Sequence, residues 1–165
     1  MIDQLLQLFA RAILAKVNAL ASRELKPNQR KRLRKSIADD IRTCGGLIFP
    51  DVVKPAVSKA AQLEADRIGV SLCEKTWHNQ AAFDPGRKVF HLEHMYPISA
   101  IQEECEQAES EEAIVQVLKT RLRVAWILKR EDKELTRLGY RSNRPDPTVA
   151  YCEAGIDLVE SATVE

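Results

Sequence analysis

The chain has 165 residues, 45% of them hydrophobic and 30% charged, and its formal net charge is +1 at pH 7. This length suits one domain, or one domain with a helical extension, and the composition is typical of a globular protein, which excludes a disordered chain. No apolar run approaches the roughly 18 residues of a membrane-spanning helix, and the first residues do not resemble a secretory signal, so we expect a cytoplasmic protein without a membrane partner.

Residues 1–75 are predicted to form a helical N-terminal segment. Apolar residues recur at steps of three and four between Ile2 and Leu20, which is the period of one helical face. A second helix is expected from Gln29 to Cys44. Gly45-Gly46 would end it, because glycine readily adopts the positive φ of a helix C-terminus. A third helix is expected from Val52 to Ile68.

Residues 76–160 are predicted to form a second domain that contains two short strands. A turn leads into the apolar run from Val89 to Leu92, and a second run from Val124 to Leu128 is rich in β-branched and aromatic residues. Residues 99–122, between the two strands, are expected to be a helical insertion in two pieces. Further helices are expected at 131–138 and between Asp146 and Gly155. The expected fold class is therefore mainly α with a small β-hairpin.

The four cysteines, Cys44, Cys73, Cys105 and Cys152, are far apart in the sequence and form no Cys-x-x-Cys pair. Zinc sites and redox motifs use such close pairs because two thiolates on one turn can share a target. We therefore expect free thiols.

The near-neutral net charge conceals two basic blocks and one acidic block. Residues 1–50 contain ten basic and four acidic residues, and residues 119–144 contain nine basic and three acidic ones. Residues 103–112 contain six glutamates and no basic residue. This distribution is compatible with a phosphate-binding face, although solvated helix faces give the same pattern.

All three histidines of the chain fall within seventeen residues, as His78, His91 and His94. The same stretch contains Asp84, Arg87 and Glu93. Histidine can transfer a proton near neutral pH or bind a metal, and a carboxylate beside it can hold a hard cation. His78 has no partner at an informative spacing, so a loop or core position is the simpler interpretation for that residue.

The segment Phe90–Pro97 reads Phe-His-Leu-Glu-His-Met-Tyr-Pro, an apolar run that ends in an acid–His pair shortly before a proline. It resembles the first strand of the HNH, or ββα-metal (His-Me finger), endonucleases. Residues 125–135 are similar to the second strand and the helix of that family, with Asp132 at the position of the helix-borne metal ligand. The similarity covers roughly residues 87–139. Arg121, Leu122 and Arg123 stand where the family has its central asparagine.

This resemblance implies a ββα-metal-like nuclease domain over residues 76–160, with Mg²⁺ or Mn²⁺ as its cofactor. Glu93 and Asp132 would bind the metal ion, and His94 would act as the general base. Arg87 would complete the catalytic residues by binding the phosphate electrostatically. The basic residues expected to contact nucleic acid are Arg30, Lys31, Arg34, Arg123, Lys129 and Arg130.

Two functional hypotheses follow. The first is a metal-dependent endonuclease that cleaves DNA, or RNA. The second is a helical module without catalysis that binds nucleic acid or protein, and a homo-oligomer is open under both. An acid next to a histidine is a common dipeptide, and Glu131-Asp132 at a helix start is what the helix dipole favours without any metal.

The first hypothesis makes a geometric prediction. The strand at 124–128 should pair antiparallel with the strand at 89–92, which brings the start of the following helix back to the end of the first strand. Carboxylate oxygens of Glu93 and Asp132 should then lie within about 4–5 Å of each other, as ligands of one ion must. The ring of His94 should face the same cleft from the other side of the phosphate site.

Overall fold

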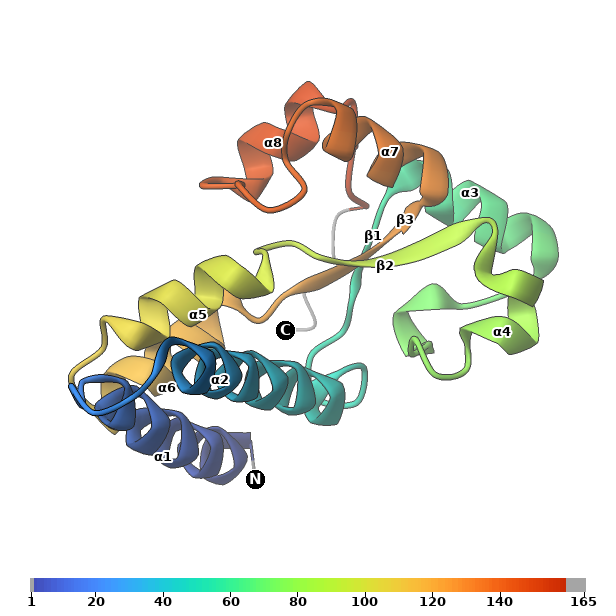
Figure 1. The fold of residues 1–165 in the computed structure, drawn as a ribbon. Helices are drawn as coiled ribbons and strands as arrows, with labels where there is room; N and C mark the ends of the chain where they lie inside the picture. Colours follow the sequence, from blue (N-terminus) through green and yellow to red (C-terminus); the bar gives the residue numbers. More distant parts are fainter. Residues whose placement is uncertain (1, 160–165) are drawn as a thin grey trace. The chain divides into compact units, whose positions relative to one another are not determined.

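The computed structural model describes residues 2–159, and their contacts group them into two compact units (Figure 1). One unit consists of the chain up to Ile48 together with Pro97–Leu122. The other consists of Phe49–Tyr96 together with the chain from Arg123 onward. This grouping differs from the expected division near residue 75, because the helices of 97–122 belong with the N-terminal helices and not with the strands that flank them.

The first unit is built from four helices, α1 (Ile2–Leu20), α2 (Pro27–Ile48), α5 (Ile98–Glu106) and α6 (Glu111–Arg121). Helix α1 packs against α2, α5 and α6, and α2 also packs against α5. The side chains buried in this unit come from one face of each helix and include Leu6, Ile13, Ile41, Ile101, Ile114 and Leu118. The apolar face of the segment expected to be an insertion is what attaches it to α1 and α2.

Helix α1 has the predicted bounds, whereas α2 is longer than predicted at both ends. It continues through Gly45 and Gly46 to Ile48, and neither glycine adopts a positive φ. Cys44, Gly45 and Ile48 are buried on the helix. Glycine permits the left-handed conformation but does not impose it, so a buried face keeps the helix intact through both residues.

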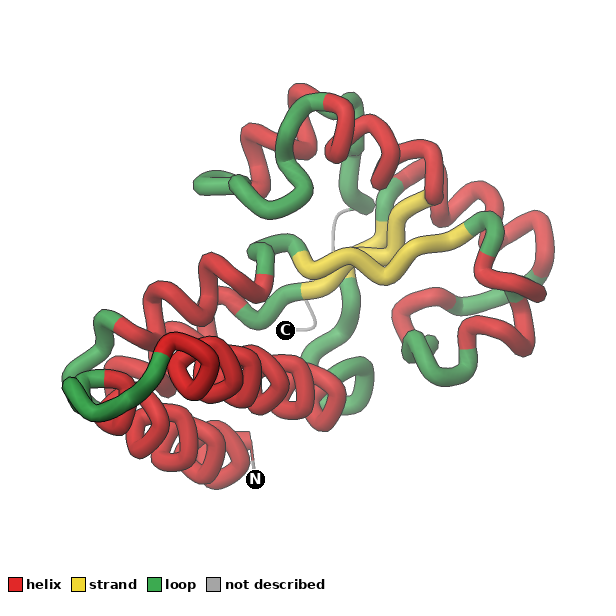
Figure 2. Tube along the Cα trace, in the orientation of Figure 1, coloured by secondary structure: helices red, strands yellow, loops and turns green. Residues whose placement is uncertain are grey.

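A three-stranded sheet forms the centre of the second unit (Figure 2). The order of its strands is β1-β3-β2. Strand β2 (Phe90–His94) pairs antiparallel with β3 (Val124–Leu128), which confirms the predicted hairpin pairing. Strand β1 (Ala56–Val57) pairs parallel with β3 and was expected to be part of a helix. Helix α3 (Lys59–Ile68) begins later than predicted, because Ser58 caps it by accepting a hydrogen bond from the backbone N–H of Ala61.

The two faces of the sheet bury different cores. On one face, Phe90 and Trp126 lie in a cluster that includes Ala61 and Ala65 of α3. On the other face, Ala125 and Ile127 lie with residues of α7 (Lys129–Arg137) and α8 (Pro147–Glu153). All five residues of β3 are buried, so the strand reads as a continuous apolar run.

Short helical segments and capped helices complete the second unit. The segments between α3 and β2 are η1 (Leu72–Glu74), α4 (Gln80–Phe83) and η2 (Pro85–Arg87). Helix α8 has the predicted cap, since the Asp146 side chain accepts from the backbone N–H of Thr148 and Gly155 adopts a φ of 67°. Within residues 2–159 no helix combines the length and the apolarity needed to cross a bilayer.

Candidate metal centre

Three side chains of the second unit bring potential metal ligands together. They are His91 and Glu93 of β2 and Asp132 of α7, and one ligand atom from each lies within 4.8 Å of the other two. Nε2 of His91 is 3.0 Å from Oε2 of Glu93 and 3.6 Å from Oδ1 of Asp132. The predicted approach of Glu93 and Asp132 is therefore present, with His91 as an additional member. We refer to these three residues as the metal cluster.

The backbone accounts for this convergence. His91 and Glu93 are two residues apart on a strand, so their side chains share one face of the sheet. Phe90 pairs with Leu128, so β3 ends beside the start of β2, and α7 begins at the next residue. Asp132 lies near the beginning of α7 and reaches the strand face from there.

Glu131 holds the start of α7 in place. Its buried carboxylate accepts hydrogen bonds from the backbone N–H of Leu128 and from the hydroxyl of Ser58, both at 2.7 Å. Ser58 also caps α3, so one buried carboxylate ties the beginnings of two helices to the sheet. Of the two acids at this helix start, Glu131 therefore has a structural role, and Asp132 is the one available to a ligand.

The guanidinium of Arg144 supports Glu93 from inside the protein. The Arg144 side chain is 1% exposed, and its Nη2 lies 2.7 Å from Oε1 of Glu93. Its Nη1 donates to the backbone carbonyls of His94 at 2.9 Å and Met95 at 3.0 Å. One oxygen of Glu93 thus faces Arg144 and the other faces His91.

This environment keeps Glu93 ionised. Burial by itself raises the pKa of Glu93, but the hydrogen bond to His91 and the charge and hydrogen bond of Arg144 outweigh burial and hold the pKa below its ordinary value. A carboxylate that stays charged in a partly buried place is the form that binds a cation. Lys129 completes the surroundings, with its Nζ at 3.4 Å from Nδ1 of His91.

His94 does not share the cleft of Glu93 and Asp132, contrary to the prediction that its ring would face this cleft without binding the metal ion. It pairs with Val124, while Glu93 pairs with Ala125. Successive strand residues point to opposite faces, so His94 lies on the face opposite to that of Glu93. Strand β2 continues through Glu93 to His94, and this extra residue of regular strand prevents the pair from sharing one cleft.

The other predicted catalytic residue, Arg87, contacts Trp77. Its guanidinium carbon lies 3.8 Å from the centre of the Trp77 ring, and its Nη2 donates to the Trp77 carbonyl. His78 packs edge-on against the same ring. Asp84 fixes the chain that follows, because its buried carboxylate accepts from the backbone N–H groups of Lys88, Val89 and Phe90.

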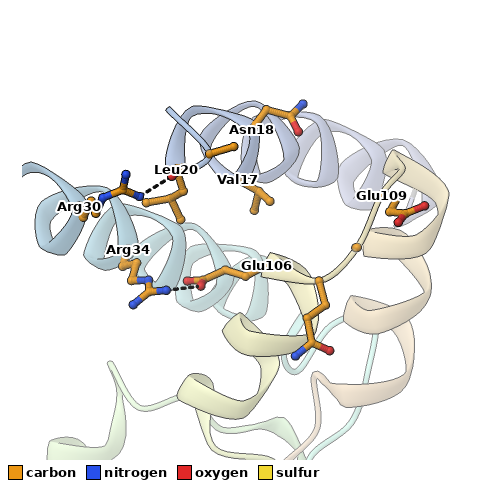
Figure 3. Close-up of a pocket in the computed structure, with 10 residues that line it drawn as sticks. Val17, Asn18, Leu20, Arg30, Arg34, Glu106 and Glu109 are labelled. Atoms are coloured by element: carbon orange, nitrogen blue, oxygen red, sulfur yellow. Dashed lines mark hydrogen bonds and ion pairs between the residues drawn. The ribbon is translucent and has the colours of Figure 1, made fainter. Parts of the chain in front are cut away.

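The basic residues predicted to bind nucleic acid fall into two groups. Those of the first unit lie on α2, where Arg30 donates to the carbonyl of Leu20 and Arg34 forms an ion pair with Glu106 at 3.0 Å (Figure 3). Arg30 also donates to the carbonyl of Ser22. Lys31 is exposed. The remaining three lie in the second unit; Lys129 contacts His91, and Arg123 and Arg130 are exposed.

The three side chains of the metal cluster are spaced so that they could hold a divalent cation. Atoms that bind one ion at about 2.1 Å lie roughly 3–4 Å apart, which is the range of the His91 distances given above. The imidazole donor favours a transition-metal ion such as Mn²⁺ over Mg²⁺, because Mg²⁺ prefers oxygen ligands and transition-metal ions also accept nitrogen. Sequence reasoning missed two residues of this site. His91 was singled out only as one of three clustered histidines, and Arg144, about fifty residues from Glu93 in the chain, gives no local signal.

Comparisons with known proteins identify no relative. No protein-family model, no curated protein and no solved structure matches the chain. The resemblance to HNH endonucleases therefore remains a hypothesis. It is carried by the acid–His pair of the sequence and by the strand–strand–helix element of β2, β3 and α7.

Proposed function

We propose that the protein is a metal-dependent endonuclease that hydrolyses phosphodiester bonds in DNA, or in RNA. The observation that carries this proposal is the metal cluster, in which a strand and the start of a helix present an imidazole and two carboxylates within 4.8 Å of one another. The antiparallel pair followed directly by a helix is the arrangement that a ββα-metal element requires.

In this proposal the three side chains hold one Mg²⁺ or Mn²⁺ ion. A bound ion of this kind neutralises the charge of a phosphate and promotes ionisation of a water molecule. His91 offers Nε2, Glu93 offers the oxygen that does not face Arg144, and Asp132 offers the third ligand atom. Arg144 keeps Glu93 charged and oriented, as groups behind a metal ligand commonly do.

Besides the buried Arg144, Lys129 brings a positive side chain to the metal cluster. Its ammonium group lies beside His91 and is positioned to attract a phosphate oxygen without binding the metal. His94 and Arg87 have no role in the proposal, because the one lies on the other face of β2 and the other stacks on Trp77.

The test is cleavage of plasmid DNA and of a structured RNA in Mg²⁺, Mn²⁺ or EDTA. We expect cleavage with metal and none with EDTA. His91→Ala and Asp132→Ala should each reduce the rate at least about 10²-fold, since each removes a ligand. His78→Ala is the matched control, because His78 is exposed and lies outside the metal cluster.

Two results would contradict the proposal. Equal activity of wild type and His91→Ala would show that the metal cluster takes no part in the reaction. Nucleic-acid binding without cleavage in any metal would favour the second hypothesis, a binding module without catalysis.

A further inference from the structure

A groove of about 560 Å³ lies in the second unit, between α3 and the junction of β3 with α7. Four cationic side chains line it, namely Arg67, Lys88, Lys129 and Arg130. Its apolar lining includes Leu63, which is 73% exposed, and Val89, which is 38% exposed. We call this feature the basic groove.

Most of the positive charge in the basic groove is not neutralised by the protein. Arg67 pairs with Glu64 on the same helix. Within residues 2–159, neither Lys88 nor Arg130 has a carboxylate within the 4 Å of an ion pair, and the polar contact of Lys129 is with the imidazole of His91. Four bases against one acid make the groove a place where a chain of negative charges is attracted.

The basic groove adjoins the metal cluster through Lys129. The same side chain lines the groove and lies 3.4 Å from the ring of His91. Lys129 and Arg130 are also the first two residues of α7, whose Asp132 belongs to the metal cluster. Lys129 is therefore the side chain that the basic groove and the surroundings of the metal cluster share.

We propose, building on the endonuclease function proposed above, that the basic groove binds the sugar–phosphate backbone of the strand that flanks the scissile phosphate. Lys88, Lys129 and Arg130 contact its phosphates, and the exposed side chains of Leu63 and Val89 contact the sugars. These contacts hold the strand in position and do not read its sequence. This occupant is favoured over an acidic peptide because Lys129 both lines the groove and contacts the metal cluster, where the proposed function places a phosphodiester.

The experiment measures binding of a labelled single-stranded oligonucleotide as a function of salt concentration, in EDTA so that binding is separated from cleavage. Lys88→Gln combined with Arg130→Gln is the variant; both side chains are exposed, and Lys129 is left intact because it contacts the metal cluster. The slope of log affinity against log salt should fall by roughly 1.4, because each phosphate of a single strand that is no longer neutralised lowers it by about 0.7. Arg23→Gln with Lys26→Gln, which removes two exposed charges from the first unit, should leave the slope unchanged.

A second readout separates this proposal from the one on which it rests. With metal present, the Lys88/Arg130 variant should show a raised KM with little change in kcat, because it retains the metal cluster. If the wild type cleaves but the Lys88/Arg130 variant has the same slope as the wild type, the groove proposal is overturned and the endonuclease proposal stands. If the slope is reduced in the variant but the wild type does not cleave, the groove proposal is supported and the endonuclease proposal is contradicted. Binding of polyglutamate in preference to the oligonucleotide would overturn the groove proposal in favour of an acidic protein partner.

Discussion

Two basic regions of the chain look alike in sequence and differ in what their side chains contact. On α2, Arg30 caps the end of α1 through two carbonyls, and Arg34 pairs with Glu106. In the second unit, Lys88 and Arg130 line a groove and form no ion pair among the described residues, although the charge of Arg130 contributes to lowering the pKa of Glu64. Counting bases therefore does not locate a phosphate-binding face. What matters is whether the folded protein already satisfies each cation, because a satisfied arginine gives up existing contacts to bind anything else.

The largest effect is expected from breaking the buried pair behind the metal cluster. Arg144→Met should lower the free energy of unfolding by about 3–5 kcal/mol, because it leaves the Glu93 carboxylate partly buried without its cation. Urea denaturation at pH 7 measures this loss. Arg141→Met, at an exposed position nearby, should change stability by less than about 0.5 kcal/mol. Equal effects of the two substitutions would contradict the role assigned to Arg144.

Asp84→Asn should cost about 2–3 kcal/mol, since the carboxylate is 3% exposed and accepts several backbone N–H groups ahead of β2. Burial raises the pKa of Asp84, but the hydrogen bonds from Phe90, Gln80, Val89 and Lys88 outweigh it and hold the pKa below its ordinary value. Its contribution to stability is therefore present above the ordinary aspartate pKa of about 4 and is lost as pH falls through the lower folded value.

Thermal unfolding between pH 2 and pH 7 tests the role of Asp84. Asp84→Asn should be less stable than wild type near neutral pH and should approach it at the acid end. Asp51→Asn, which alters an exposed aspartate, provides the control. A constant difference across the whole range would show that the charge of Asp84 contributes nothing.

The metal preference should change with His91. We expect wild type to bind Mn²⁺ more tightly than Mg²⁺, because imidazole is one of the three donors. His91→Asp converts the site to oxygen donors and should reduce the ratio of the two affinities by about tenfold. Isothermal titration calorimetry gives both constants, and His78→Asp should leave the ratio as it is. If wild type binds neither ion, the metal cluster is an ion-pair network instead.

The smallest effect concerns the basic residues of α2. Arg30→Gln should lower stability by about 1 kcal/mol by removing the hydrogen bonds to the end of α1. Lys31→Gln, one residue along the same helix and exposed, should be close to neutral. Neither should weaken oligonucleotide binding as much as a single substitution of Lys88. If the α2 substitutions weakened oligonucleotide binding more than a Lys88 substitution, the phosphate-binding face would lie on α2.

Sequence reasoning succeeded where a local pattern was decisive. The period of apolar residues predicted α1, and the Asp-Pro start with a later glycine predicted α8. Two short apolar runs predicted β2 and β3, and their pairing followed from the requirement that a helix start return to a strand end. Strand β1 escaped prediction because two residues that pair with β3 carry no period of their own.

What the sequence by itself determined is the set of side chains available for chemistry and the strand–strand–helix element that brings Glu93 near Asp132. Only the tertiary structure decided which of their neighbours join them. Strand register places His91, and not His94, on the face of Glu93, since neighbouring strand residues point in opposite directions. A loop far along the chain supplies Arg144, and contacts between helices assign 97–122 to the first unit. These choices depend on long-range packing, which no short stretch of sequence records.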